Sequence, residues 1–215
     1  MKTNKKIERI IDFLKRRYPS SKTALVSNNP FQLLIATILS AQCTDERVNK
    51  VTPALFKRFK TPKDFAEADI REIEDYIKST GFYHNKAKNI KECCKILVEK
   101  YNGELPGDID ELVKLPGIGR KTANVVLGNG FGIASGIVVD THVLRVAQRL
   151  GLSRSSDPLK VEENLIKIVP KDYWIEFSNS MILFGREICS ARSPACEKCE
   201  LYDVCEYPDK KVRKA

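Results

Sequence analysis

Four of the seven cysteines lie close together near the end of this 215-residue chain, with a spacing that suits metal coordination. They are Cys189, Cys196, Cys199 and Cys205, in the pattern C-x6-C-x2-C-x5-C. Four thiolates on one short loop can hold a tetrahedral zinc ion or an iron–sulfur cluster. Zinc ribbons usually pair two CxxC segments, whereas this chain has one such segment and two outlying cysteines. The spacing therefore favours a cluster over zinc, with four free thiols as the weakest interpretation.

Basic side chains surround this cysteine-rich segment, and a loop stiffened by a metal can present them to phosphates. They are Arg186, Arg192, Lys198, Lys210, Lys211, Arg213 and Lys214. A solubilising tail is the alternative interpretation of residues 210–214. The other cysteines, Cys43, Cys93 and Cys94, follow no ligand spacing, and we expect them to be small buried hydrophobic residues.

A second pattern, Leu115-Pro-Gly-Ile-Gly-Arg-Lys-Thr-Ala-Asn124, has the features of a tight turn between two helices. Pro116 ends the first helix, and Gly117 and Gly119 permit a turn at positive φ. A new helix then begins near Arg120, and its free N–H groups form an anion site. The spacing matches neither common nucleotide-binding loop. We therefore predict a helix-hairpin-helix that grips a DNA phosphate through backbone amides; an ordinary helical turn is the alternative.

Two residues beside this hairpin could carry chemistry. Lys121 lies in the first turn of the new helix, where the helix N-terminus and Arg120 both disfavour a protonated amine, so it can act as a nucleophile. Asp140 can cap the helix that follows it and can also stabilise positive charge on a sugar or shuttle a proton. We expect His142 to be a hydrogen-bonded neighbour and not a catalyst, and His84 is a candidate DNA contact.

The elements that must position these residues are helices, because apolar side chains recur at helical spacing almost throughout the chain. A nearly all-apolar helix after Pro30 must be central to its domain. The residues 137–139 form the one notable β-branched run. The expected helices cover residues 7–14, 31–39, 48–59, 70–77, 86–100, 108–115, 141–150, 159–168 and 173–188.

Composition limits the class of protein. The 37 Lys and Arg residues exceed the 28 Asp and Glu residues, which gives a net charge of +9 and makes a nucleic acid the first candidate partner. A chain that is 42% hydrophobic and 30% charged is neither disordered nor a membrane bundle. The basic start of the chain lacks the apolar core of a secretory signal, so we expect a cytoplasmic protein whose cysteines bind metal.

The hairpin sequence, the VDTHVLR motif at 139–145, the four-cysteine spacing and SAQCTD at 40–45 together resemble the endonuclease III family of DNA base-excision glycosylases. The resemblance runs from about Ser27 to Glu206. It implies an all-α, two-domain helix-hairpin-helix glycosylase fold. A six-helix barrel domain would cover residues 23–133, with the hairpin at about 108–130. A second helical domain, residues 1–22 plus 134–215, would carry a [4Fe–4S] cluster on the loop 189–205, which makes zinc improbable.

The resemblance also implies roles for single residues. Lys121 matches the family's Schiff-base lysine, Asp140 its essential aspartate, and Gln42 the glutamine that fills the gap left by a flipped nucleotide. Phe82 stands where the family often has a leucine wedge. The hairpin residues Gly117, Ile118, Gly119, Arg120 and Lys121 would contact DNA, and His84 remains a candidate contact on its residue type alone. The resemblance makes Cys189, Cys196, Cys199 and Cys205 the cluster ligands.

The function that the resemblance implies is removal of a damaged base, expected to be an oxidised pyrimidine, followed by cleavage of the strand. The related adenine glycosylases lack the hairpin lysine, so Lys121 favours this bifunctional type. The expected partner is duplex DNA with a damaged base or an abasic site. We expect the protein to be a monomer and expect no association with a membrane. Two alternatives stay open: a monofunctional glycosylase for mispaired or alkylated bases, and a non-enzymatic DNA-binding protein.

Overall fold

The computed structural model of the chain describes residues 3–210, and its regular structure is helical. No β-strand occurs within that range, which confirms the all-α prediction. The β-branched run Ile137–Val139 is a buried connection and not a strand. Of the helices described, none combines the length and apolar character that crossing a bilayer requires. Contacts divide the chain into two compact units: unit 1 joins the chain up to Lys22 with the chain from Gly136, and unit 2 is Thr23–Ser135.

Unit 2 contains the hairpin and is built from seven α-helices, with a 3₁₀ turn and a π-helical segment. The helix after Pro30 begins as predicted, with Asn29 Oδ1 accepting a hydrogen bond from the Gln32 amide at 2.8 Å. Its residues 33–39 are all buried, so it is the central helix of the unit. The elements are α2 (Pro30–Leu39), α3 (Asp45–Arg58), α4 (Pro62–Glu67), α5 (Ile70–Ile77), η1 (Lys78–Thr80), α6 (Tyr83–Tyr101), α7 (Ile109–Leu112), α8 (Arg120–Val126) and η2 (Leu127–Phe131).

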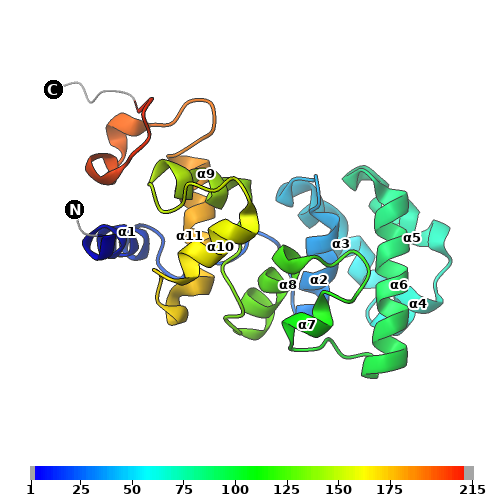
Figure 1. The fold of residues 1–215 in the computed structure, drawn as a ribbon. Helices are drawn as coiled ribbons and strands as arrows, with labels where there is room; N and C mark the ends of the chain where they lie inside the picture. Colours follow the sequence, from blue (N-terminus) through cyan, green and yellow to red (C-terminus); the bar gives the residue numbers. More distant parts are fainter. Residues whose placement is uncertain (1–2, 211–215) are drawn as a thin grey trace. The chain divides into compact units, whose positions relative to one another are not determined.

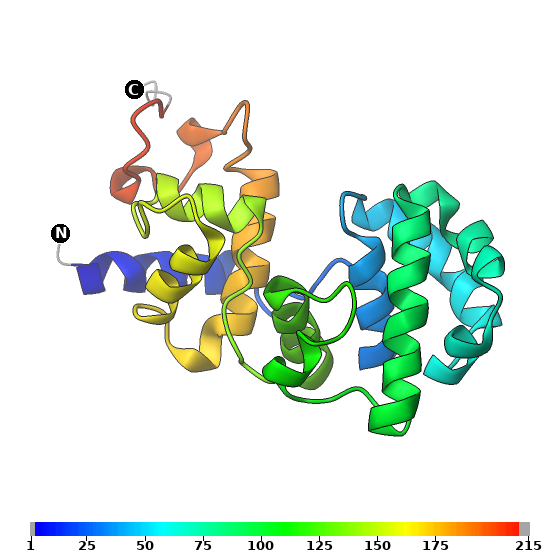
Figure 2. The ribbon, with the colours of Figure 1, turned by 45° about the vertical axis from the view of Figure 1, so that its right-hand side comes forward.

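The long helix α6 lies against α4 and α5, and α2 packs against α8 (Figures 1 and 2). Aromatic rings fill the space between these helices, with the Phe59 and Phe65 centroids 4.8 Å apart. Cys93 and Cys94 are fully buried in this core, as predicted, and Cys43 packs partly buried against it. The core therefore fixes the ends of α2, α6 and α8, where the candidate DNA contacts of this unit lie.

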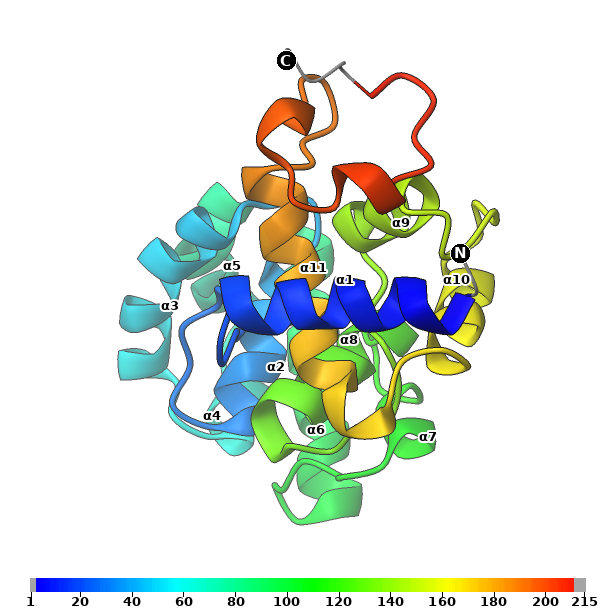
Figure 3. The same cartoon turned by 90° about the vertical axis from the view of Figure 1, so that its left-hand side faces the viewer.

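Within residues 3–22 and 136–210, unit 1 has four α-helices and three short 3₁₀ turns. The predicted apolar face of the first helix is buried, and this helix crosses α11, where the Phe13 and Phe184 rings meet edge to face at 5.5 Å (Figure 3). Ion pairs from α1 to Glu200 and Glu206 hold it beside the cysteine-rich segment. The elements are α1 (Thr3–Arg17), α9 (Thr141–Arg149), α10 (Pro158–Ile166), η3 (Lys171–Tyr173), α11 (Trp174–Glu187), η4 (Cys196–Lys198) and η5 (Tyr202–Val204).

Candidate functional site

The predicted hairpin joins α7 to α8 through a tight turn. Asp108 caps α7, because its Oδ1 accepts hydrogen bonds from the amides of Asp110 at 2.9 Å and Glu111 at 3.1 Å. The Ile118 amide then donates to the Leu115 carbonyl at 3.2 Å. Both of these apolar side chains are buried, so they anchor the turn in the core of unit 2. The glycines of the turn are left exposed at the surface.

The two glycines have different conformations. Gly117 has a φ of +77°, and a Cβ there would lie 2.9 Å from the Cβ of Asn89. Only glycine satisfies both conditions, as predicted. The same expectation is wrong for Gly119, which is extended at φ −91° because it is the N-cap residue of α8. A Cβ at Gly119 would meet nothing within 4 Å, so the backbone at the start of α8 faces open space from which an anion can approach.

Lys121 lies in the first turn of α8 and is exposed, next to exposed Arg120. Among the described residues of unit 2, no hydrogen bond or ion pair engages the Lys121 ammonium. Its amine is therefore accessible beside the glycine turn and is not held in a structural ion pair within its own unit.

Asp140 is the N-cap residue of α9 in unit 1, as predicted. Its Oδ1 accepts hydrogen bonds from the amides of His142 and Val143, both at 2.8 Å. Its Oδ2 lies 3.0 Å from His142 Nδ1, which confirms His142 as a hydrogen-bonded neighbour. The Asp140 side chain keeps 15% of its surface exposed. One oxygen thus fixes the carboxylate to the start of α9, and the other contacts the His142 ring.

Of the three remaining candidate contacts of unit 2, Gln42 and Phe82 lie on exposed turns, and His84 lies at the start of α6. Gln42, between α2 and α3, is exposed and has a φ of +54°. Phe82 directly precedes α6, has a φ of +49° and is 64% exposed. His84 is exposed, and its Nδ1 lies 2.8 Å from Glu74 Oε1. Phe82 thus combines a left-handed backbone with an exposed aromatic ring, and both features are uncommon for a residue of this type.

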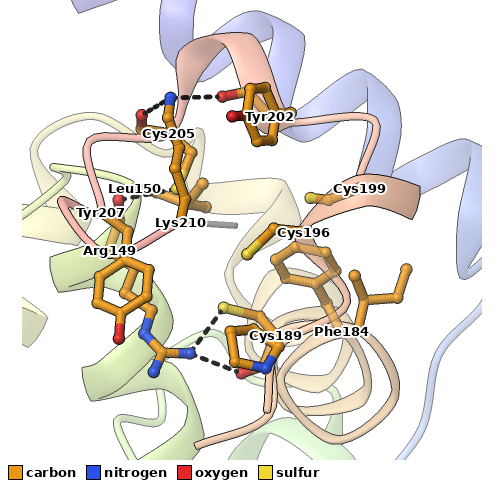
Figure 4. A pocket seen from close by; sticks show the side chains of 12 residues that line it. Arg149, Leu150, Phe184, Cys189, Cys196, Cys199, Tyr202, Cys205, Tyr207 and Lys210 are labelled. Atoms are coloured by element: carbon orange, nitrogen blue, oxygen red, sulfur yellow. Dashed lines mark hydrogen bonds between the residues drawn. The ribbon is translucent and has the colours of Figure 1, made fainter. Parts of the chain in front are cut away.

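The four predicted ligand cysteines line one pocket beyond the end of α11, together with apolar side chains that include Leu150 and Phe184 (Figure 4). No group of three or more His, Cys, Asp or Glu side chains in the described chain is arranged to hold a single metal ion. A zinc ion needs sulfur atoms about 2.3 Å from one point, whereas an iron–sulfur cluster accepts ligands that are spread around it. The pocket supplies four cysteine sulfurs among apolar side chains, which is the donor set that the predicted cluster takes.

Burial makes two of these thiols, Cys199 and Cys205, weaker acids. It raises the pKa of Cys199 to about 11 and also raises the pKa of Cys205. Positive charge comes from Arg149, whose Nη1 donates to Cys189 Sγ at 3.4 Å (Figure 4). The same Nη1 also donates to the Ser190 carbonyl at 2.7 Å. The site is thus a low-polarity pocket with a guanidinium at its edge.

Two basic groups around the pocket differ from expectation. Lys210 was expected to face phosphates, but its Nζ donates to the carbonyls of Tyr202 at 3.0 Å and Cys205 at 2.9 Å, and so it holds the loop itself. Arg145, one turn before Arg149 on α9, donates to the Gly185 carbonyl at 2.8 Å and was not predicted. The i, i+4 spacing of Arg145 and Arg149 places both side chains on one face of α9, and this was the sequence feature from which a shared role could have been predicted. Three of the basic residues predicted here, Lys211, Arg213 and Lys214, lie outside the described residues.

Comparison with known proteins assigns the chain to a family. Residues 35–171 match the model of HhH-GPD superfamily base excision DNA repair proteins, and residues 189–205 match that of the iron–sulfur binding domain of endonuclease III. Endonuclease III of Synechocystis sp. is 52% identical over 196 residues, covering 91% of this chain and 90% of that protein. Endonuclease III of Escherichia coli is 43% identical over 210 residues, covering 98% and 99%. The match on the four cysteines identifies the cofactor as a [4Fe–4S] cluster.

Solved structures agree with this assignment. A trapped covalent endonuclease III–DNA intermediate, an estranged-adenine complex, has a TM-score of 0.91 at 50% identity and covers 96% of this chain and 97% of that one. A non-covalent endonuclease III–DNA complex has a TM-score of 0.93 at 49% identity and covers 100% of both chains. A thermostable thymine-DNA glycosylase has a TM-score of 0.87 at 25% identity, covering 95% and 97%. The chain belongs to the endonuclease III family of the HhH-GPD superfamily of base excision DNA repair proteins.

Proposed function

We propose that this protein is a bifunctional DNA glycosylase and abasic-site lyase that excises damaged pyrimidines from duplex DNA and cuts the strand. The observation that carries the proposal is the similarity, at 50% identity over 96% of the chain, to an endonuclease III that was trapped in covalent linkage with DNA. Such a linkage requires a protein nucleophile, and the accessible amine of Lys121 is placed at the hairpin where the family has its Schiff-base lysine.

Binding of the duplex rests on the backbone of the hairpin. Because the Leu115 carbonyl engages the Ile118 amide, the amides of Gly119 and Arg120 receive a phosphate, with the Gly117 turn and the Arg120 side chain beside them. The net charge of +9 supports a polyanionic partner and steers it to the protein. We assign this task to unit 2 as the predicted barrel domain, and we expect the protein to act as a monomer.

Access to the damaged base requires that its nucleotide leave the stack. Flipping costs a few kcal/mol and costs less for a base that stacks poorly, which favours oxidised pyrimidines that have lost aromatic planarity. We assign Gln42 to filling the vacated position and Phe82 to wedging between bases, since both side chains are exposed on turns. His84 adds a contact through the ring nitrogen that Glu74 does not engage.

The chemistry proceeds at the C1′ carbon of the deoxyribose. The Lys121 amine attacks C1′, the bond to the base breaks, and the base takes the electron pair and a proton. Asp140 stabilises the positive charge that develops on the sugar and accepts the proton that the amine loses. The C1′–O4′ bond of the resulting aminal then breaks, O4′ takes the proton that Asp140 received, and the nitrogen lone pair forms an imine between Lys121 and the opened sugar. This imine acidifies the C2′ proton, its loss expels the 3′ phosphate by β-elimination, and water hydrolyses the imine. Glycosylase and lyase steps thus use one amine.

The cysteine-rich segment is assigned to holding shape and not to catalysis, because no step above transfers an electron. When bound by Cys189, Cys196, Cys199 and Cys205, the cluster cross-links residues 189–205. Arg145 and Arg149 of α9 secure the same segment through its carbonyls. The loop then presents the exposed side chains of Arg192 and Lys198 toward solvent, where they can meet phosphates.

Incubation with a panel of lesion-bearing duplexes tests the proposal, provided that base release and strand scission are scored separately. The wild-type protein should release an oxidised pyrimidine and cut the strand, and Lys121→Ala should cut neither lesion duplexes nor preformed abasic sites. Release of a mispaired or alkylated base with an intact strand would instead support a monofunctional glycosylase. Binding without any product would support a non-enzymatic DNA-binding protein.

A further inference from the structure

One lysine of unit 2 is buried, although lysines usually lie at the surface. Lys86, in the first turn of α6, is 5% exposed, and burial lowers its pKa. Its Nζ donates hydrogen bonds to the carbonyls of Leu39 and Thr80, both at 2.8 Å. A buried ammonium is tolerated only where hydrogen bonds compensate for its lost hydration. Both partners here are backbone carbonyls, so the group serves a particular arrangement of the main chain.

The two carbonyls share a position in their elements. Leu39 is the last residue of α2, and Thr80 is the last residue of η1. Carbonyls at the C-terminal end of a helix lack helical partners and attract cations. A single ammonium therefore caps two segments that are far apart in sequence, and it holds their ends at a fixed distance from each other.

Each capped segment leads directly into an exposed left-handed residue. Gln42 follows Leu39 by three positions and has a φ of +54°, and Phe82 follows Thr80 by two positions and has a φ of +49°. The Lys86 amide also donates to the Phe82 carbonyl at 3.1 Å. Non-glycine residues persist in this backbone region where surrounding bonds over-determine them. Among the described residues, the non-glycine positions with positive φ are Ser20, Gln42, Phe82 and Asn102.

We propose that Lys86 is a positioning residue that ties the turn carrying Gln42 to the turn carrying Phe82, so that both side chains are presented to DNA in a fixed relative arrangement. The inference rests on the proposed function, which assigns these two side chains to the gap left by a flipped nucleotide. If the two side chains are already held in place, they enter the gap without a further loss of conformational entropy. Such a loss would otherwise reduce the binding free energy.

The test compares Lys86→Met with a matched control, Ile90→Ala. Methionine keeps a long unbranched side chain but removes all three donors. Ile90 lies one turn further along α6, is fully buried in the same core, and loses packing without touching either capped carbonyl. Lys86→Arg restores a charged donor and serves as the rescue variant, and Lys86→Gln, which removes the charge but keeps a polar end, replaces Lys86→Met if that variant does not fold.

Hydrogen–deuterium exchange on the DNA-free proteins is the first readout, because it does not depend on any activity. Exchange should rise in residues 40–43 and 80–83 of Lys86→Met, and should stay low there in Ile90→Ala and fall back in Lys86→Arg. Unchanged exchange in both turns of Lys86→Met would overturn the proposal. If Lys86→Met does not fold, the same comparison is made with Lys86→Gln, and unchanged exchange in both turns of that variant would likewise overturn the proposal.

Activity is the second readout. Base release requires that the base be flipped out, whereas a preformed abasic site has no base to extrude. Lys86→Met should therefore slow base release about tenfold or more, which is the effect of losing one charge-assisted hydrogen bond. It should slow cutting at an abasic site far less. In a Gln42→Ala/Phe82→Ala background the same substitution should have no further effect. Equal losses in both assays, or an undiminished effect in that background, would contradict the proposal. A wild-type protein without base release would refute the proposed function instead, and the exchange data would still decide whether Lys86 ties the two turns.

Discussion

The two glycines of the hairpin turn allow phosphate binding to be separated from folding. Gly119 is extended at φ −91°, and an added Cβ would meet nothing within 4 Å. Gly117 has a φ of +77°, and an added Cβ would lie 2.9 Å from Asn89 Cβ. The fold therefore tolerates alanine at Gly119 and resists it at Gly117, although both positions are exposed in the same turn.

For Gly119→Ala we expect a stability within about 1 kcal/mol of wild type, because alanine restricts the unfolded chain but caps a helix less well than glycine does. The new methyl group occupies the open space from which a phosphate reaches the amides of α8. Loss of one hydrogen bond to a charged group costs about 1.5–3 kcal/mol, which weakens DNA binding roughly 10- to 100-fold. No charge is removed, so the slope of log affinity against log salt concentration should not change.

For Gly117→Ala we expect a loss of stability as well as of binding. A residue with a Cβ costs about 1–2 kcal/mol in the left-handed region, and Asn89 must also move. For a chain of this size each kcal/mol lowers the melting temperature by roughly 2–4 °C. The two variants thus lose DNA binding together but differ in their melting temperature.

Circular dichroism melting and fluorescence anisotropy with a labelled duplex measure the two quantities. The duplex should carry a reduced abasic analogue, which is bound but not cut. A Gly119→Ala protein that melts like wild type and also binds this duplex like wild type would refute the assignment of the phosphate to the hairpin amides.

Three further predictions concern the cap, the cluster and alkaline pH. Asp140→Asn keeps a good helix cap, so it should lose most turnover at unchanged stability. Asp140→Ala should lose turnover and also about 1 kcal/mol of unfolding free energy. Full turnover of Asp140→Asn in steady-state kinetics would show that Asp140 acts only as a helix cap. Cys199→Ser should lower the iron content of the purified protein and raise hydrogen exchange in residues 189–205 while leaving unit 2 protected; wild-type iron by metal analysis would remove this cysteine from the ligand set. The free energy of unfolding should fall as pH rises through 9 toward 12, because burial raises the pKa of Cys93 from 9.0 to about 12 and also raises the pKa of Cys94. In this range the unfolded chain releases thiol protons that the folded chain keeps. Urea titrations should show that the free energy of unfolding depends less steeply on pH when both cysteines are replaced by alanine, and an unchanged dependence would contradict this cause.

The helices were predictable from sequence where their signals are local. Apolar spacing located residues 70–77 as the structure has them, and Asp108 and Asp140 were recognisable as caps from the residues that follow them. The six-residue helix α4 was not predicted, because it is too short to show apolar periodicity. A proline such as Pro62 can end one segment or begin a helix, and here it is the first helical residue after the Thr61 cap. The run 137–139 formed no strand because no second strand exists within residues 3–210 to pair with it.

The site was predictable where one short segment carries the whole pattern, as in the four cysteines and the glycine hairpin. Contacts between distant segments were not. Lys86 binds a carbonyl 47 positions away, and Arg149 binds one 40 positions away. Neither spacing leaves a trace in sequence, since a lysine in a helix is far more often exposed than buried. The conformation of Gly119 likewise depends on its place as a helix cap and not on its residue type alone.

The most direct test of the account identifies the atom that bonds to DNA. Borohydride reduction of the protein with an abasic-site duplex, followed by nuclease and protease digestion and mass spectrometry, locates the deoxyribose adduct on a peptide. We expect the adduct on Lys121, in the peptide that begins α8, and no adduct in Lys121→Ala. An adduct on the N-terminal amine or on another lysine, or trapping that persists in Lys121→Ala, would contradict the central claim.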